Sequence, residues 1–245
     1  MKNIFTVVAL LLTCGSAMAH ALWIETAAAG KVNKKQEVKV FYGEYSYGIF
    51  EEVGSETYNK VKDFELWAVA PNGQKTVLAL TPSEKYYSAW FTPKADGAYT
   101  LVLNNNKIDV LDFTQYNFGI FKTHYHATAK VNVGKNAGET AAVNPDGITI
   151  TDVTAITPTK DGATTLRVLY KGQPVKDIEV AVEMGNHWGQ KIKTNEKGEV
   201  SFTTPWKATY LAEATTKEEV PGSYNGNDYQ FIWHCATYTI PVAGK

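Results

Sequence analysis

Glu37-Val38-Lys39-Val40-Phe41-Tyr42 places charged side chains at its first and third positions, and apolar side chains fill the positions between and after them. Successive side chains of a β-strand point to opposite faces, so this pattern predicts a strand with one buried face. Residues 64–69 and 98–103 continue the pattern, and turn sequences rich in Pro, Asn and Gly separate the three stretches. Short strands at this spacing are typical of a β-sandwich.

The second half of the chain repeats this arrangement, with alternating stretches at residues 166–170 and 178–183. Between the halves, residues 132–147 are rich in Gly, Asn, Ala and Lys, which is typical of a linker or a long surface loop. We therefore predict an all-β chain with two β-sandwich domains, over residues 20–131 and 148–245.

One short motif adds detail to the first domain. Asp96-Gly97-Ala98-Tyr99 resembles the corner of an immunoglobulin-like sandwich, in which a Tyr near the start of a strand is tied back to the backbone. We expect Tyr99 to make such a contact.

Residues 1–19 predict export from the cytoplasm. Lys2 precedes an apolar run from Ile4 to Cys14, and Ala17-Met18-Ala19 matches the pattern that signal peptidase cleaves. The run is shorter than the ~20 residues that a membrane span needs. We expect a mature chain that begins at His20 and resides in the periplasm. A retained membrane anchor and acylation of Cys14 are the alternatives.

Composition excludes several classes of function. The chain has 24 Lys and Arg residues against 25 Asp and Glu residues, and no basic cluster predicts a nucleic-acid partner. No second apolar stretch reaches membrane length, so we expect no stable membrane insertion. Cys235 is the one cysteine left after cleavage, which excludes an internal disulfide and predicts a buried, inert thiol. Hydrolase, phosphate-loop and dinucleotide motifs are absent, so we do not predict an enzyme, and Glu51-Glu52 reads as a solvated loop.

The five histidines are the candidate metal ligands. An N-terminal His20 offers its α-amine and imidazole Nδ1 as a chelate suited to copper, nickel or cobalt. His124 and His126 point to the same face of a predicted strand, which fits either a shared metal or two solvated side chains. We predict one divalent metal ion at His20 with help from His124 or His126. His187, in a predicted loop, and His234, within a strand, are further candidates or structural residues.

Several motifs in order resemble one family. Ala19-His20-Ala21-Leu22-Trp23-Ile24-Glu25 is similar to the opening of the nickel-uptake transporter family, periplasmic proteins associated with cobalt and nickel uptake. Residues 89–93, 172–175 and 236–240 resemble later strands and turns of that family. The resemblance implies two β-sandwich domains, the second transthyretin-like, and a metal-related role in the periplasm. It carries over His20 alone as a site residue.

These observations favour a periplasmic protein that captures nickel, cobalt or copper and delivers it to an uptake or handling system, with a membrane metal-uptake transporter as partner. Two alternatives stay open. One is a metal-free adhesion or scaffold protein made of two sandwich domains. The other is a copper enzyme whose N-terminal His supports oxidative chemistry.

Overall fold

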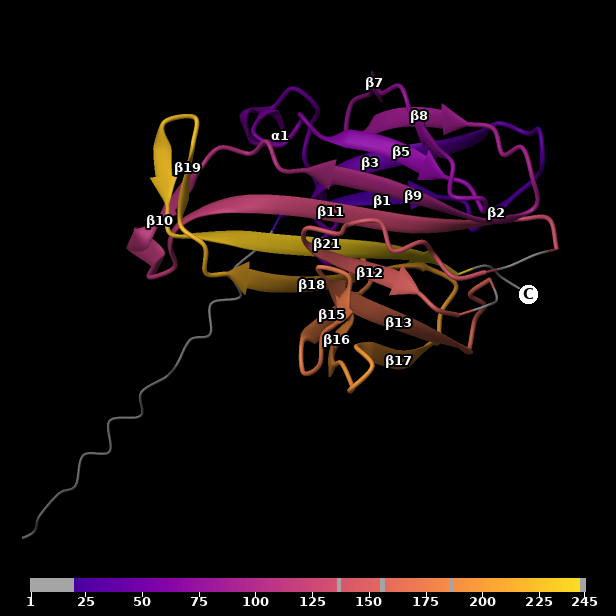
Figure 1. Cartoon of the computed structure of the whole chain (residues 1–245). Coiled ribbons are helices and arrows are strands. Elements are labelled where there is room, and N and C mark those ends of the chain that lie inside the picture. Colours follow the sequence, from indigo (N-terminus) through magenta and orange to yellow (C-terminus); the bar gives the residue numbers. More distant parts are fainter. Residues whose placement is uncertain (1–19, 136–137, 155–156, 186, 243–245) are drawn as a thin grey trace, which may run out of the picture.

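The structure is a computed structural model that describes residues 20–135, 138–154, 157–185 and 187–242 (Figure 1). The predicted signal peptide and both alternatives to it lie outside the described residues. Strands dominate the described part, with one short helix, α1 (Glu56–Asn59), and one 3-10 helix, η1 (Thr114–Tyr116). The all-β prediction is confirmed. In this part of the chain, no helix has the length and apolar character needed to cross a membrane.

A long central sheet has the strand order β16-β15-β18-β21-β11-β9-β5-β6, and β2 and β10 pair with β11. Its bounds are β2 (Ala29–Gly30), β5 (Glu65–Val69), β6 (Lys75–Val77), β9 (Gly97–Asn105), β10 (Leu111–Phe113), β11 (Gly119–Val133), β15 (Glu179–Glu183), β16 (Gly189–Lys193), β18 (Thr209–Glu218) and β21 (Phe231–Pro241).

Two smaller sheets pack on this central sheet, and a hairpin projects from one end (Figure 1). The first small sheet contains β1 (Ala21–Thr26), β3 (Gln36–Glu44), β4 (Ile49–Phe50), β7 (Thr81–Pro82) and β8 (Tyr87–Phe91). The second contains β12 (Ile148–Asp152), β13 (Gly162–Tyr170), β14 (Gln173–Pro174) and β17 (Glu199–Thr204). The hairpin is formed by β19 (Gly222–Tyr224) and β20 (Asn227–Tyr229).

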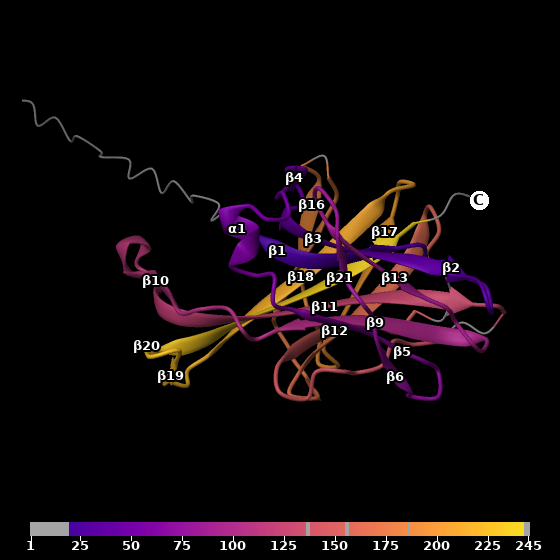
Figure 2. The same ribbon diagram turned by 90° about the horizontal axis from the view of Figure 1, so that it is seen from above.

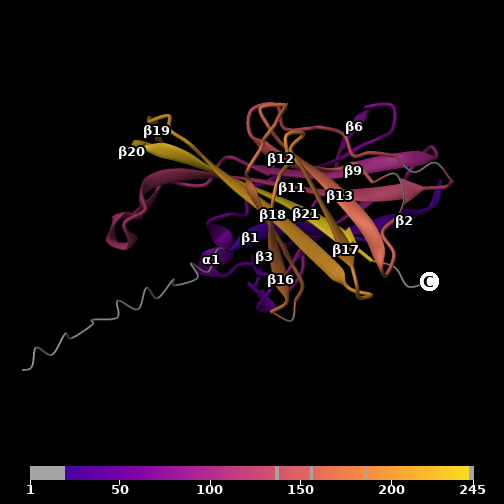
Figure 3. The same ribbon diagram turned by 90° about the horizontal axis from the view of Figure 1, so that it is seen from below.

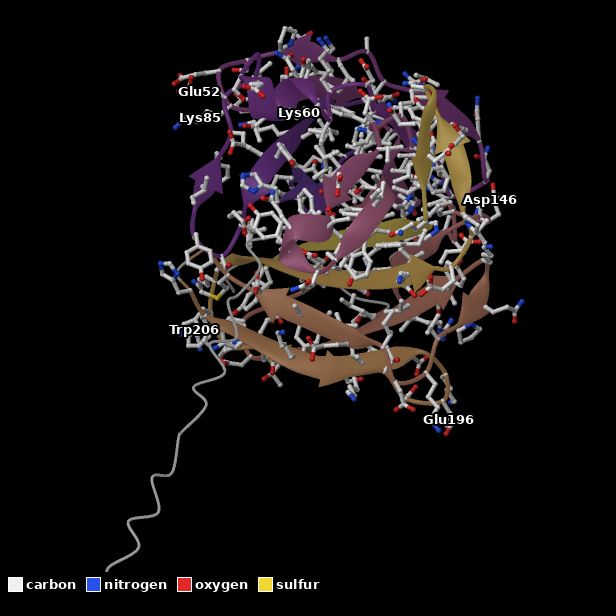
Figure 4. All side chains as sticks on the ribbon, turned by 90° about the vertical axis from the view of Figure 1, so that its left-hand side faces the viewer. Glu52, Lys60, Lys85, Asp146, Glu196 and Trp206 are labelled. Atoms are coloured by element: carbon white, nitrogen blue, oxygen red, sulfur yellow. The ribbon has the colours of Figure 1, made fainter. Side chains whose placement is uncertain are left out.

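The small sheets cover opposite faces of the central sheet, as the side chains of β11 demonstrate. Ala127 and Ala129 lie in the first hydrophobic core, among side chains such as Leu22 and Leu101. Thr128 points the other way, because side chains alternate along a strand, and its hydroxyl donates to the carbonyl of Ile150 in β12. In Figure 1 the first small sheet lies above β11 and β21, and β12, β13 and β17 lie below them. Figure 4 shows the same order from one end, and Figures 2 and 3 look onto the molecule from above and from below.

The two larger hydrophobic cores draw their buried residues from 22–133 and from 148–242, and a smaller third cluster packs Trp23 and Phe41 against Leu211. Residues 132–133, predicted as the start of a linker, are the buried end of β11. The two halves nevertheless share the central sheet. Strands β11 and β21 run parallel at the centre of the long sheet, from Phe121 opposite Phe231 to Ala129 opposite Thr239. Residues 134–135 and 138–147 form neither helix nor strand.

In each half, the hydroxyl of one buried Tyr accepts hydrogen bonds from the backbone of the preceding turn. The hydroxyl of Tyr99 accepts the backbone N–H groups of Lys94 and Ala95 at 3.0 and 3.1 Å, so the predicted tyrosine contact is confirmed. In the second half, the hydroxyl of Tyr210 accepts the N–H of Trp206 at 2.9 Å.

Candidate functional site

His20 immediately precedes β1 and lies beside the end of β3. Its Nδ1 is 2.9 Å from Oε1 of Glu44, and its Nε2 is 2.7 Å from Oε1 of Glu51. The hydroxyl of Tyr125 donates to the backbone carbonyl of His20 at 2.7 Å. The ring of Tyr42 lies 5.3 Å from the imidazole, centroid to centroid. The imidazole is therefore held on both nitrogens and along one side.

Gly43 explains how the two carboxylates come to flank one ring. It has φ +152°, and a Cβ atom there would lie 2.0 Å from the carbonyl oxygen of Ile49. Only glycine admits this close approach of β4 to β3. The close turn brings Glu51, just past β4, back to Glu44, the last residue of β3.

The two carboxylates beside His20 leave one close contact unsatisfied. A neutral imidazole carries one N–H, so it donates to one of the two carboxylates and turns a lone pair toward the other. A proton shared between that nitrogen and its carboxylate, or a metal ion, would remove this repulsion. Glu44 is 5% exposed, and its Oε1 forms no hydrogen bond even though it lies within ion-pair distance of His20. Burial raises the pKa of Glu44, and the nearby His20 lowers it.

More negative charge lies behind this pair. Burial, together with the charges of Glu183 and Glu44, raises the pKa of Glu213 on β18 to about 7. Burial and the charge of Glu213 also raise the pKa of Cys235 well above its ordinary value, so this buried residue is a neutral thiol. The surroundings of His20 are thus rich in carboxylates and favour a bound cation.

His124 and His126 do not join this site. Tyr125 reaches His20, so its neighbours on β11 point to the opposite face of the central sheet. The predicted pairing of His20 with His124 or His126 is not formed, because the sheet itself separates them. The prediction that His124 and His126 share a face agrees with the structure, since both line one cavity of about 360 Å³.

That cavity contains a second histidine pair. His234 on β21 lies directly opposite His124 on β11, and their ring centroids are 5.1 Å apart. Nε2 of His234 is 2.9 Å from Oε2 of Glu218. His126 is already engaged on both nitrogens, by the side chains of Asn104 and Thr149 at 3.0 Å each. Burial lowers the pKa of His126 to about 3, which is typical of a neutral structural histidine.

His187 lies apart from both groups. It is exposed, adopts φ +63°, and donates its backbone N–H to the carbonyl of Ser46. Its ring packs edge-on against Tyr47 at 4.8 Å. The predicted loop position agrees with the structure, and the contacts of the ring are structural.

Sequence reasoning missed the carboxylates of both groups. The sequence predicts a solvated loop at Glu51, whereas the carboxylate of Glu51 contacts His20. Neither Glu44 nor Glu218 belongs to a recognisable motif. With side chains as they stand, the described residues hold no group of three or more His, Cys, Asp or Glu side chains arranged to bind a metal ion.

Comparisons with known proteins give a family without an assigned role. The sequence family described as Domain of unknown function (DUF4198) matches residues 17–218. No curated protein matches the chain. Among solved structures, it is similar to the CARDB domain of the PF1109 protein from Pyrococcus furiosus, crystallised in complex with di-metal ions. That match has 20% identity and a TM-score of 0.25, and it covers 47% of this chain and 88% of the other.

Proposed function

The chain belongs to the DUF4198 family, and we propose that it is an exported protein that binds one divalent transition-metal ion at His20 and passes it to an uptake or handling system. Nickel, cobalt and copper are the candidate ions. The expected location is the periplasm, and a membrane metal-uptake transporter is the expected partner.

The observation that supports this proposal is the placement of one imidazole between two carboxylates. Glu44 and Glu51 each lie within 3 Å of a different nitrogen of His20. Imidazole nitrogen combined with carboxylate oxygen suits divalent nickel, cobalt and copper. A cation there would offset the charge of a buried carboxylate whose Oε1 has no hydrogen bond among the described residues.

Removal of residues 1–19 would add a further ligand. Cleavage after Ala19 leaves the α-amine on His20, and amine and Nδ1 then chelate one ion from a single residue. Glu44 is near Nδ1 and is placed to complete the ligand set or to neutralise it. The proposed site thus becomes competent only after processing, which restricts metal loading to exported protein.

The test is a titration of protein that begins at His20 with Ni²⁺, Co²⁺ and Cu²⁺, followed by calorimetry and, for copper, electron paramagnetic resonance. Two changes should each weaken binding by about tenfold or more: His20→Ala, and an additional Met before His20 that displaces the α-amine. His187→Ala is the matched control, because that exposed histidine lies outside the site. If both altered proteins bind as tightly as the processed protein, the proposal is wrong.

A scaffold or adhesion role is the second candidate. It is favoured by the exposed aromatic side chains Phe113, Tyr116 and Phe118, which are 40%, 67% and 40% exposed at the projecting end of the central sheet. In Figure 1 this end, with β10 and β19, extends beyond both sandwiches. A processed protein that binds no metal ion but adheres to a surface through these residues would favour this role.

A further inference from the structure

We propose that His124 and His234 bind a second transition-metal ion, Zn²⁺ or Cu²⁺, on the face of the central sheet opposite to His20. The two residues occupy equivalent positions on the parallel strands β11 and β21 and line the same cavity. This site is independent of the function proposed for His20.

The spacing of the two rings is the first argument. Their centroids are 5.1 Å apart and their planes are perpendicular. A metal–nitrogen bond of ~2.1 Å places an imidazole centroid ~3.2 Å from the ion, so two imidazoles at a tetrahedral angle have centroids ~5 Å apart. The pair therefore already has the separation that a shared ion requires. The pairing of the parallel strands β11 and β21 supplies this separation.

The second argument is the carboxylate behind His234. Nε2 of His234 lies 2.9 Å from Glu218, an arrangement that commonly orients metal-binding histidines. Burial raises the pKa of Glu218, but hydrogen bonds from Lys171, His234 and Tyr170 outweigh it and lower the pKa to about 2. Glu218 engages Nε2 of His234, so Nδ1 is the nitrogen left for a ligand.

The available nitrogens form the third argument. A Cβ atom at residue 147 would lie 3.1 Å from Nδ1 of His234, so glycine at this position leaves room beside that nitrogen. Among the described residues, no side chain or backbone group hydrogen-bonds to the ring of His124. Burial lowers the pKa of His124 to about 4, with smaller contributions from His234 and Lys122, and burial also lowers the pKa of His234.

The cavity also has space for the rest of a coordination shell. Its volume of about 360 Å³ exceeds that of several water molecules, each occupying about 30 Å³ in the liquid. Asn104, Asn144 and Lys171 line it, so waters or a small polar ligand would find hydrogen-bond partners there. Two protein nitrogens with open positions describe an accessible site, distinct from a closed structural one.

The test uses the His20→Ala protein, in which the first site lacks its imidazole. Titration with Zn²⁺ alone should still show one bound ion, and Zn²⁺ should raise the thermal midpoint. Adding His124→Ala should weaken that binding by about 100-fold and abolish the thermal shift. His187→Ala in the same background is the control and should change neither value. With Cu²⁺, the paramagnetic resonance spectrum should show two coordinated nitrogens, and one after His124→Ala.

The results separate this proposal from the previous one. Unchanged Zn²⁺ binding after His124→Ala would overturn the second site, and so would loss of all binding in His20→Ala alone. One ion retained in His20→Ala and lost on adding His124→Ala supports it, whatever happens at His20. The side chain of His124 is half-buried and has no hydrogen bond to any residue that the structure describes, so its removal should leave the fold intact. Circular dichroism of each variant checks this, and Gly147→Ala, which crowds Nδ1 of His234, gives a second route to weaker binding.

Discussion

The buried ion pair of Lys130 and Asp152 connects the central sheet to the second sandwich, and breaking it should destabilise the protein strongly. Lys130 lies on β11 and Asp152 ends β12. Their Nζ and Oδ2 atoms are 2.6 Å apart, and the side chains are 3% and 0% exposed. Three further hydrogen bonds complete the group: Tyr238 to Oδ2 at 2.9 Å, the N–H of Thr154 to Oδ1 at 2.7 Å, and Lys130 to the carbonyl of Thr154 at 2.7 Å.

The magnitude follows from what each substitution leaves behind. Lys130→Met keeps most of the aliphatic volume but leaves Asp152 as a buried charge with two neutral donors. Removing one partner of such a pair costs ~3–5 kcal/mol of the free energy of unfolding. Asp152→Asn should cost a similar amount, because the ammonium group of Lys130 then has no counter-charge. The double variant removes both charges and should cost less than either single change, since paired burial contributes little net stability.

The assay is chemical denaturation of the four proteins in a double-mutant cycle. We expect a coupling energy of at least ~3 kcal/mol between the two positions. Lys160→Met is a control, because Lys160 is half exposed in its ion pair with Asp161 and should change stability by under ~1 kcal/mol. Single changes that cost under ~1 kcal/mol, or that simply add in the double variant, would refute the reasoning. A coupling energy below ~3 kcal/mol would mean that water enters between β11 and β12.

Three other predictions use the same structure. The pKa of Glu213 is about 7 in the folded protein against an ordinary 4.5, so its ionisation lowers the free energy of unfolding as pH rises through this interval. Glu213→Gln should therefore stabilise the metal-free protein by ~2–3 kcal/mol more at pH 8 than at pH 4. A stability gain that does not depend on pH would contradict this. Tyr99→Phe leaves two backbone N–H groups without their acceptor and should cost ~1–3 kcal/mol in denaturant unfolding, whereas Tyr116→Phe on the surface should cost almost nothing. Gly43→Ala forces the Ile49 carbonyl away and should lower both the stability of the protein and its affinity for Ni²⁺. Gly48→Ala is the control: no atom lies within 4 Å of the added Cβ, so it should cost only ~1 kcal/mol of stability for its φ of +65° and leave the affinity unchanged.

Local patterns predicted the strands and the face to which each side chain points. The alternation at residues 37–42 lies within β3, and residues 98–103 lie within β9. Tyr99 was predicted from four consecutive residues, since its contact reaches back only to Lys94 and Ala95. Tyr210 makes the same kind of contact, and the Pro205-Trp206 turn before it was the signal that could have found it.

Sequence alone could not determine which histidines meet. The shared face of His124 and His126 follows from the two-residue period of a strand, and the structure agrees. The same period does not predict which strand lies beside β11. That neighbour is β21, whose residues pair with residues of β11 more than a hundred positions away in the sequence. That pairing places His234 beside His124 and puts the sheet between His124 and His20. Backbone hydrogen bonds between strands do not depend on the side chains, so they do not determine which strands pair. The packing of the side chains in both hydrophobic cores determines it.

The positions of the carboxylates beside the histidines also depend on tertiary structure. Glu44 and Glu51 are seven positions apart with no motif between them, and the tight approach at Gly43 brings them to one imidazole. Glu213 and Glu218 come from a strand of the second half. The sequence by itself determined an all-β chain and its alternating faces, and it made His20 a candidate ligand. Tertiary structure decided the two histidine environments, because the charges that define them come from neighbouring strands. The pairing of β1, β3 and β4 brings Glu44 and Glu51 to His20, and the pairing of β18 with β21 brings Glu218 to His234.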